Sequence, residues 1–227
     1  MRYFTSYFSK TERIIWGASV FMVLLSFVIF DRRNYATLLA SLIGVTSLLY
    51  NAKGNPIGQA MTAIFSLFYG AISFSFHYYG EMITYLGMTM PMALLALVSW
   101  LRNPYKGNKA EVTVNRVRGK ERVFMVLLTL LVTILFYFIL KFFHTANLLP
   151  STLSVTTSFL AVYLTFRRDL YFALAYASND VVLIVMWALA SIEDPSYVAV
   201  LACFAAFLLN DIYGFINWRK MEKRQTA

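Results

Sequence analysis

Residues 123–140 read VFMVLLTLLVTILFYFIL, an apolar run that contains no charged residue. A helix needs about 20 such residues to cross the hydrocarbon core of a bilayer. Comparable runs, two of them broken by a single aspartate, lie at 14–30, 34–52, 54–80, 82–101, 142–166, 170–192 and 195–218. Continuous runs argue against a barrel, whose strands alternate apolar and polar residues in segments of about ten. The sequence predicts an all-α membrane protein with about eight transmembrane helices.

The basic residues are placed unevenly along the chain. The formal net charge is +9 and the mean hydropathy is +0.63, a combination typical of a membrane protein rather than of a nucleic-acid-binding domain. If the N-terminus is cytoplasmic, only Arg32, Arg33 and Lys141 of the 20 Lys and Arg residues face outward. This positive-inside bias predicts a multi-pass protein of the inner membrane with both termini in the cytoplasm. The outside loops are then expected to hold the acidic residues Glu81, Glu193 and Asp194.

The longest polar stretch, 102–122, divides the chain into two halves of four helices. We expect it to be a basic cytoplasmic loop inside a single transporter domain that spans 1–227. The halves end alike, with Ser99-Trp100-Leu101-Arg102 and Asn217-Trp218-Arg219-Lys220. Four helices return the chain to the same side of the membrane, so the repeats would be parallel, related by an axis along the membrane normal. Transporters with internal repeats commonly bind their substrate at the repeat interface near the midplane.

Two of the apolar runs contain a carboxylate, in the pairs Asn179-Asp180 and Asn210-Asp211. The hydrocarbon core penalises a charge by several kcal/mol, so such a residue normally faces a protein interior or an aqueous path. At a rise of about 1.5 Å per residue, Asp180 lies roughly 15 Å and Asp211 roughly 10 Å from the cytoplasmic ends of their helices. The two aspartates are at comparable depth, and we expect them to serve one cavity. The alternative is a structural hydrogen-bonding role.

A polar stripe runs along the 54–80 helix, made of Gln59, Thr62, Ser66, Tyr69 and Ser73. Spacings of three and four residues place these side chains on one helix face. That face is expected to turn inward, because exposed hydroxyl and amide groups would go unsatisfied in lipid. Hydrogen bonding between helices is the alternative to substrate contact.

The last two apolar runs add aromatic and amide side chains near the aspartates. Tyr176 and Trp187 share a face with Asp180, and Tyr213 and Asn217 share one with Asn210. Carboxylates, amides and aromatic faces together suit a cationic or heteroaromatic solute. For the tryptophans at the helix ends the alternative is anchoring at the membrane–water interface. The residues expected to bind substrate are Gln59, Ser66, Tyr69, Trp100, Tyr176, Asn179, Asp180, Trp187, Asn210, Asp211, Tyr213, Asn217 and Trp218.

The sequence offers no candidate catalytic residue. No histidine or cysteine cluster has metal-ligand spacing, and Cys203 stands alone within a helix, where packing explains it. No phosphate-cradling glycine loop, catalytic triad or nucleophile elbow is present. We therefore expect a transporter rather than an enzyme, with no cofactor and no bound metal.

Residues 209–220 read LNDIYGFINWRK, and residues 78–82 read YYGEM, followed by Pro91-Met92 and Trp100. These stretches resemble the closing Asn-x-x-Tyr-Gly-x-x-x-Trp pattern and the fourth-helix region of the nicotinamide riboside transporter family, the PnuC-type vitamin transporters. The basic segment 116–122 is similar to the family's middle loop, and the similarity runs from about Thr37 to Lys220. Family members often carry Trp-x-x-Trp before the asparagine at position 179, whereas residues 171–178 of this chain contain no tryptophan.

The resemblance implies a fold related to the SWEET sugar transporters. Residues 34–101 and 149–219 would form three-helix bundles, 123–143 the linker helix between them, and the first helix an addition. It also implies uptake of nicotinamide riboside, an NAD precursor, by facilitated diffusion, with trapping by a separate cytoplasmic kinase, and a homotrimer. Another vitamin such as thiamine is the alternative within the family. From the residues themselves, a proton-coupled cation transporter that uses Asp180 and Asp211 as a relay stays open.

Overall fold

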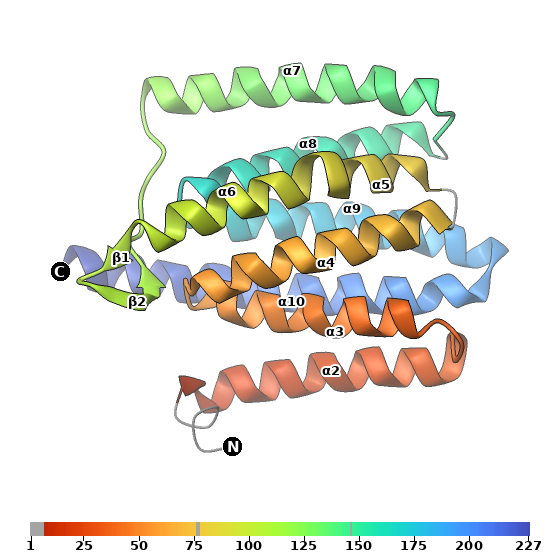
Figure 1. The fold of residues 1–227 in the computed structure, drawn as a ribbon, viewed down its shortest axis with the longest axis horizontal. Coiled ribbons are helices and arrows are strands. Elements are labelled where there is room, and N and C mark those ends of the chain that lie inside the picture. The colour runs from red at the N-terminus through yellow and green to blue at the C-terminus, as the bar shows by residue number, and fades with distance from the viewer. Residues whose placement is uncertain (1–6, 76–77, 146) are drawn as a thin grey trace.

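The computed structural model describes residues 7–75, 78–145 and 147–227. Within these residues eight helical segments are long and apolar enough to cross a membrane, as the sequence predicts. The helices run roughly parallel to one another along the long axis of the molecule (Figure 1). The elements are α2 (Lys10–Phe30), α3 (Tyr35–Ala52), α4 (Pro56–Ser75), α5 (Tyr79–Thr84), η1 (Tyr85–Thr89), α6 (Met90–Leu101), β1 (Pro104–Tyr105), β2 (Asn108–Val112), α7 (Lys120–Phe142), α8 (Leu148–Phe166), α9 (Phe172–Glu193), η2 (Pro195–Tyr197) and α10 (Val198–Thr226).

The end of the bundle where α2 begins and α10 finishes carries most of the basic side chains, and we call it the basic end. The opposite end, where α10 begins, is the far end. The 102–122 segment lies at the basic end and contains an antiparallel hairpin, β1–β2, that was not expected from the sequence (Figure 1). The Val112 N–H donates to the Gly54 carbonyl (2.9 Å), and the Asn115 N–H donates to the Arg168 carbonyl (3.0 Å). The loop is therefore tied by backbone hydrogen bonds to the α3–α4 and α8–α9 turns.

The helices form two groups of three spans, α3–α4–α5/α6 and α8–α9–α10. Within the groups α4 packs against α3 and α6, and α9 packs against α8 and α10. Between the groups α3 packs against α10, and α6 packs against α8. At the two edges of the bundle α2 packs against α10 and α3, and α7 packs against α8. The prediction of two three-helix bundles, a linker helix and an added first helix is compatible with these contacts and stays a prediction.

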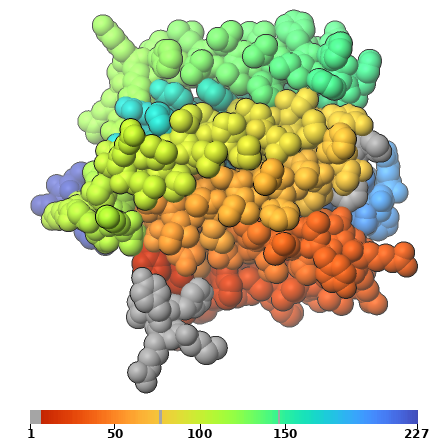
Figure 2. Space-filling model, viewed as in Figure 1, coloured from red at the N-terminus to blue at the C-terminus, as the bar shows by residue number. Residues whose placement is uncertain are grey.

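The helix α7 forms a separate ridge along one edge of the molecule (Figure 2). Its outer face is made of large apolar side chains that are each more than half exposed, including Leu127, Leu131, Ile134 and Phe138. Such a face would be unstable in water and is typical of a surface that contacts lipid.

The turns that follow α3 and α8 have the same backbone geometry. Gly54 and Arg168 adopt left-handed conformations, with φ of +65° and +59°. The next residues, Asn55 and Asp169, each accept a hydrogen bond at Oδ1 from the N–H two residues on, both at 3.0 Å. An internal repeat is one way to obtain the same turn at two separate places in a chain.

Two buried tryptophans bond to the ends of neighbouring helices at the basic end. The Trp100 Nε1 donates to the Thr165 carbonyl at the end of α8 (2.9 Å), and the Trp218 Nε1 donates to the Asn51 carbonyl at the end of α3 (2.8 Å). The two rings are 5.4 Å apart between centroids, and neither is exposed. The interpretation of these residues as anchors at the lipid interface is therefore wrong, because both rings are enclosed by helices.

The span Tyr79–Leu101 is not a continuous α-helix. A π-helical turn, η1, separates α5 from α6, and the Met90 N–H bonds to the Tyr85 carbonyl five residues back. Pro91 follows directly and has no backbone N–H to donate. The change from π-helical to α-helical hydrogen bonding therefore occurs where the helix already lacks one backbone hydrogen bond. The expectation that Glu81 lies in an outside loop is also wrong. Glu81 is part of α5, and it is 2% exposed.

Candidate functional site: a polar cavity between the helix groups

A cavity of about 40 Å³ lies between the two helix groups. Its polar lining comes from both groups, with Asn51 on α3 and Thr62 on α4 facing Asn179 and Asp180 on α9 and Asp211 on α10. The complete lining is Ser47, Leu48, Asn51, Thr62, Phe65, Tyr85, Thr89, Ser158, Tyr176, Asn179, Asp180, Phe207 and Asp211. The sequence predicts a substrate site at such an interface.

The carboxyl groups of Asp180 and Asp211 meet in this cavity. They are 3% and 4% exposed, and they interact directly with each other. One oxygen of Asp180, Oδ2, has no hydrogen-bond partner among the described residues. Two carboxyl groups in a buried site favour a positive charge between or beside them, supplied by a proton or by a bound cation.

Two asparagines provide amide groups on opposite walls. The Asn179 Oδ1 accepts from Ser154 Oγ (3.1 Å) and Thr157 Oγ1 (2.9 Å), both on α8. These bonds occupy its oxygen and leave its NH₂ group without a protein partner in the described part of the chain. Asn51 is held by Gln59, whose Nε2 donates to Asn51 Oδ1 (2.8 Å). Asn51 itself donates to Thr62 Oγ1 (3.1 Å).

Aromatic rings form much of the remaining wall. Phe65 lies 5.3 Å from Phe207 and 5.9 Å from Tyr85 between ring centroids, and all three rings line the cavity. Tyr176 closes it on the α9 side. Faces of aromatic rings attract cations, with energies of roughly 0.5–2 kcal/mol per contact.

The cavity is small in the described conformation. A volume of about 40 Å³ holds a few water molecules, whereas pockets for larger organic ligands occupy roughly 300–1,000 Å³. The walls must therefore separate before a solute larger than water can enter. The π-helical turn that supplies Tyr85 and Thr89 is an irregular wall segment of the kind often found at functional sites.

Four of the residues expected to bind substrate line the cavity, namely Tyr176, Asn179, Asp180 and Asp211. Gln59 reaches it indirectly, through its bond to Asn51. Ser66 lies on the inward face of α4, where its hydroxyl donates to the Thr62 carbonyl.

The expected α10 residues other than Asp211 are directed elsewhere. The Asn210 amide donates to Ser19 Oγ on α2 (2.8 Å), and the Tyr213 hydroxyl donates to Glu12 Oε1 on α2 (3.1 Å). The Asn217 amide donates to the Ala52 carbonyl (2.7 Å). Trp100 and Trp218 bind helix-end carbonyls at the basic end. The structure therefore does not bring these five side chains together with Asn179.

Tyr69 and Trp187, also expected at the site, lie in a neighbouring aromatic cluster toward the far end. Their ring centroids are 6.5 Å apart, and Tyr69 is 4.4 Å from the cavity residue Tyr85. They are adjacent to the cavity rather than part of its lining.

Sequence reasoning missed Asn51, Tyr85 and Ser158, which line the cavity. A signal for Asn51 exists, because Ser47 and Asn51 are four residues apart and share one face of an apolar helix. Tyr85 had no such signal, since its direction depends on the π-helical turn.

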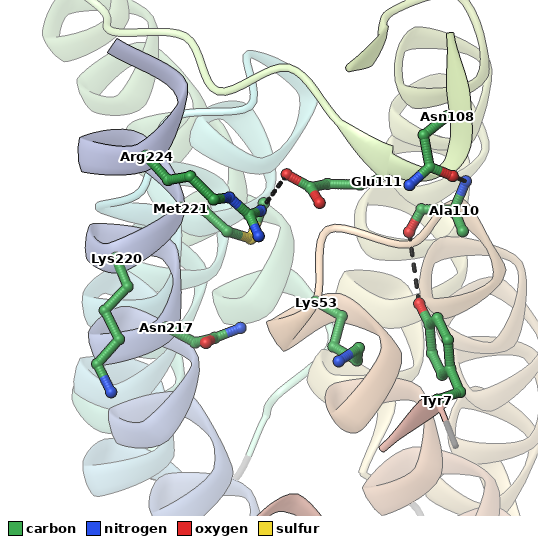
Figure 3. A pocket seen from close by; sticks show the side chains of 9 residues that line it. All are labelled: Tyr7, Lys53, Asn108, Ala110, Glu111, Asn217, Lys220, Met221 and Arg224. Carbon is green, nitrogen blue, oxygen red and sulfur yellow. Dashed lines mark hydrogen bonds and ion pairs between the residues drawn. The ribbon is translucent and has the colours of Figure 1, made fainter. Parts of the chain in front are cut away.

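A second and larger pocket of about 440 Å³ lies at the basic end, and Figure 3 shows it. Three of its four charged lining residues have protein partners: Arg224 pairs with Glu111, and Lys53 pairs with Glu12 (3.3 Å), while Lys220 is the fourth. The Tyr7 hydroxyl donates to the Ala110 carbonyl on its rim (Figure 3). This pocket lacks the facing carboxyl groups of the central cavity, so we place the functional site in the smaller one.

Comparison with known proteins confirms the resemblance seen in the sequence. The model of a family described as nicotinamide mononucleotide transporter matches residues 34–220. The nicotinamide riboside transporter PnuC of Neisseria mucosa is 24% identical over 206 residues, which cover 88% of this chain and 77% of that protein. The protein of the same name from Haemophilus influenzae is 22% identical over 216 residues, covering 95% and 92%. A crystal structure of the vitamin B3 transporter PnuC shares the fold, with a TM-score of 0.83 at 21% identity, covering 96% of this chain and 94% of that one.

Proposed function

This chain belongs to the nicotinamide mononucleotide transporter family, and we propose that it carries nicotinamide riboside across the inner membrane. It is a membrane transporter rather than an enzyme. The observation that carries the substrate assignment is the central cavity, in which two carboxyl groups, an asparagine amide and aromatic rings converge.

Each part of nicotinamide riboside has a chemical match in this cavity. The pyridinium ring is a flat cation, which suits the rings of Phe65, Tyr85 and Phe207 and the carboxyl groups of Asp180 and Asp211. The carboxamide and the ribose hydroxyls both donate and accept hydrogen bonds, as the amides of Asn51 and Asn179 do.

The same lining argues against a phosphorylated substrate. No Lys or Arg residue lines the cavity in the described part of the chain. A phosphate would meet two carboxyl groups there without a cation to neutralise it, which is unfavourable in a buried site. The cavity chemistry therefore supports the riboside over the mononucleotide named in the family description.

The direction of the protein in the membrane follows from its charge. We infer that the basic end faces the cytoplasm, because the Lys and Arg residues concentrate there. A reporter fused to the C-terminus should then be active only on the cytoplasmic side. Activity confined to the external face would overturn this orientation.

The resemblance to PnuC-type transporters supports the rest of the scheme. Facilitated diffusion would bring the riboside in, and a separate cytoplasmic kinase would trap it by adding the phosphate that the cavity rejects. The same resemblance supports a homotrimer.

A second candidate is a proton-coupled cation transporter, favoured by the direct contact of Asp180 with Asp211. Carboxyl pairs of this kind serve as proton relays in membrane pumps and transporters. Thiamine, another ring-bearing cation, is the alternative substrate.

Uptake into liposomes that contain the purified protein tests these alternatives together. We expect saturable entry of nicotinamide riboside down its gradient, no entry of the mononucleotide, and no accumulation driven by an imposed pH gradient. Accumulation above equilibrium that follows the proton gradient would favour the relay. Entry of thiamine without entry of the riboside would contradict the substrate assignment.

A further inference from the structure

Glu81 is a third carboxylate inside the bundle, and the central cavity does not include it. It lies in α5 near the far end and is 2% exposed. Its Oε2 has no hydrogen-bond partner, and no basic residue pairs with it in the described part of the chain. Burying an unpaired carboxylate is costly, so such a group is retained where a ligand or a proton completes it.

Three other polar groups near Glu81 are buried without partners. They are the Tyr69 hydroxyl, the Ser73 hydroxyl and the Trp187 Nε1, none of which makes a well-formed hydrogen bond among the described residues. The Tyr69 hydroxyl and the Trp187 Nε1 are close enough to interact with each other. Tyr69 and Ser73 share a face of α4, four residues apart. The Glu81 carboxylate is close enough to the Tyr69 and Tyr85 hydroxyls to interact electrostatically with both. Buried polar groups without well-formed hydrogen bonds are costly, so several of them in one region indicate a place that a solute or water completes.

A continuous series of aromatic rings connects this region to a surface pocket at the far end and to the central cavity. Tyr78 lines a surface pocket of about 400 Å³ at the far end and lies 4.8 Å from Trp187 between ring centroids. Trp187 is 6.5 Å from Tyr69, which is 4.4 Å from Tyr85, and Tyr85 lines the central cavity. Burial raises the pKa of Tyr78 to about 12, so its ring meets a passing solute in the neutral form at any working pH.

We propose that Glu81, Tyr69, Ser73 and Trp187 form a second binding station for an aromatic organic cation, between the far-end pocket and the central cavity. The proposal rests on the proposed function, because it assigns this station to the same translocation path. The carboxylate offsets the positive charge, the rings of Tyr69 and Trp187 cover the faces of the solute ring, and the unpaired hydroxyl and N–H groups bond its polar substituents.

The test compares two solutes that differ in charge and little else: nicotinamide riboside and its neutral 1,4-dihydropyridine form. Initial uptake into liposomes is measured for the wild type, for Glu81→Gln and for Asp31→Asn, a carboxylate at the end of α2 that lies outside the far-end pocket. Glu81→Gln should lower uptake of the cation about tenfold, the factor that 1.4 kcal/mol represents, and change uptake of the neutral form less than twofold. Asp31→Asn should change neither by more than twofold.

Melting curves of the same variants serve as the folding control. Glu81→Gln should melt no lower than the wild type, since it removes a buried carboxylate that no basic residue neutralises and whose Oε2 has no hydrogen bond to lose. Equal loss of both solutes, loss of neither, or a melting temperature clearly below that of the wild type would overturn the proposal. If the wild type carries neither form, the proposed function itself fails, and this outcome is separate from a failure of the Glu81 variant.

Discussion

Glu12 and Glu81 lie at opposite ends of the helix bundle, and both are 2% exposed. Glu12 accepts from the Ser9 N–H (2.7 Å) and the Tyr213 hydroxyl (3.1 Å), and it pairs with Lys53 (3.3 Å). The Glu81 Oε2 has no partner among the described residues. A buried charge supports a fold when its partners surround it and opposes the fold when they are missing. A buried glutamate thus stabilises the fold at the basic end, whereas at the far end a buried glutamate keeps an oxygen free to bind a solute.

The tryptophans repeat this contrast. At the basic end Trp100 and Trp218 each donate to a helix-end carbonyl. Toward the far end the Trp187 Nε1 is buried without a hydrogen bond in the described structure. The buried tryptophans of the basic end therefore have hydrogen-bond partners. Several buried polar groups between the far end and the central cavity do not. This difference is what a transporter requires if one end is shut while the path from the other end accepts a solute.

The largest expected effect comes from the two glutamates. Glu12→Gln should destabilise the protein by about 2 kcal/mol, below the roughly 3–5 kcal/mol of a fully buried pair because the Lys53 side chain is 22% exposed. This corresponds to a drop in melting temperature of about 5 °C for a chain of this size. Glu81→Gln should cause no drop. Thermal melting in detergent measures both, and an equal drop would remove the contrast between the two ends.

The tryptophans give the next effect. Trp100→Phe and Trp218→Phe each remove one of two hydrogen bonds to a buried carbonyl, whose remaining donor is the N–H of Arg168 or Gly54. Each should cost about 0.5–1.5 kcal/mol beyond the loss of ring size. Trp187→Phe removes the same volume but breaks no hydrogen bond, so it serves as the matched control. Melting curves of the three variants should therefore separate Trp187→Phe from the other two. Indistinguishable curves would mean that the bonds at the basic end contribute little.

The tyrosines give the smallest effect. Tyr213→Phe removes one donor to Glu12 and should cost about 0.5–1 kcal/mol. Tyr69→Phe removes a hydroxyl that has no partner, so its melting temperature should equal or exceed that of the wild type. A destabilised Tyr69→Phe variant would show that this hydroxyl already has a structural partner.

Much of the fold follows from the sequence because lipid imposes simple rules. An uncharged run of the required length must form a spanning helix, and a carboxylate within such a run must face inward. These rules predict the eight spans, and they predict that Asp180 and Asp211 face inward, where both line the central cavity. Glu81 was assigned to a loop because it separates the uncharged runs 54–80 and 82–101, and the start of α5 at Tyr79 has no marker in the hydropathy pattern.

The direction of each side chain was harder to predict. Asn210 and Asp211 are neighbours on α10 and therefore point about 100° apart. Asp211 faces the cavity, whereas Asn210 faces Ser19 on α2. Which of two adjacent faces meets the cavity depends on the positions of the neighbouring helices, and the pattern of a single helix does not contain that information. The hairpin β1–β2 was missed for a related reason, since it depends on bonds to distant turns.

We propose that substrate binds in the cavity between the helix groups. A comparison of Asn179, which lines the cavity, with Asn210, which does not, tests this placement most directly. Calorimetric titration of nicotinamide riboside should give an affinity about tenfold weaker for Asn179→Ala than for the wild type, since a lost buried bond costs about 1–3 kcal/mol. Asn210→Ala should bind within twofold of the wild type and show its effect in the melting temperature, because its amide bonds to Ser19. Unchanged affinity in Asn179→Ala, or an equal loss in Asn210→Ala, would contradict this placement of the site.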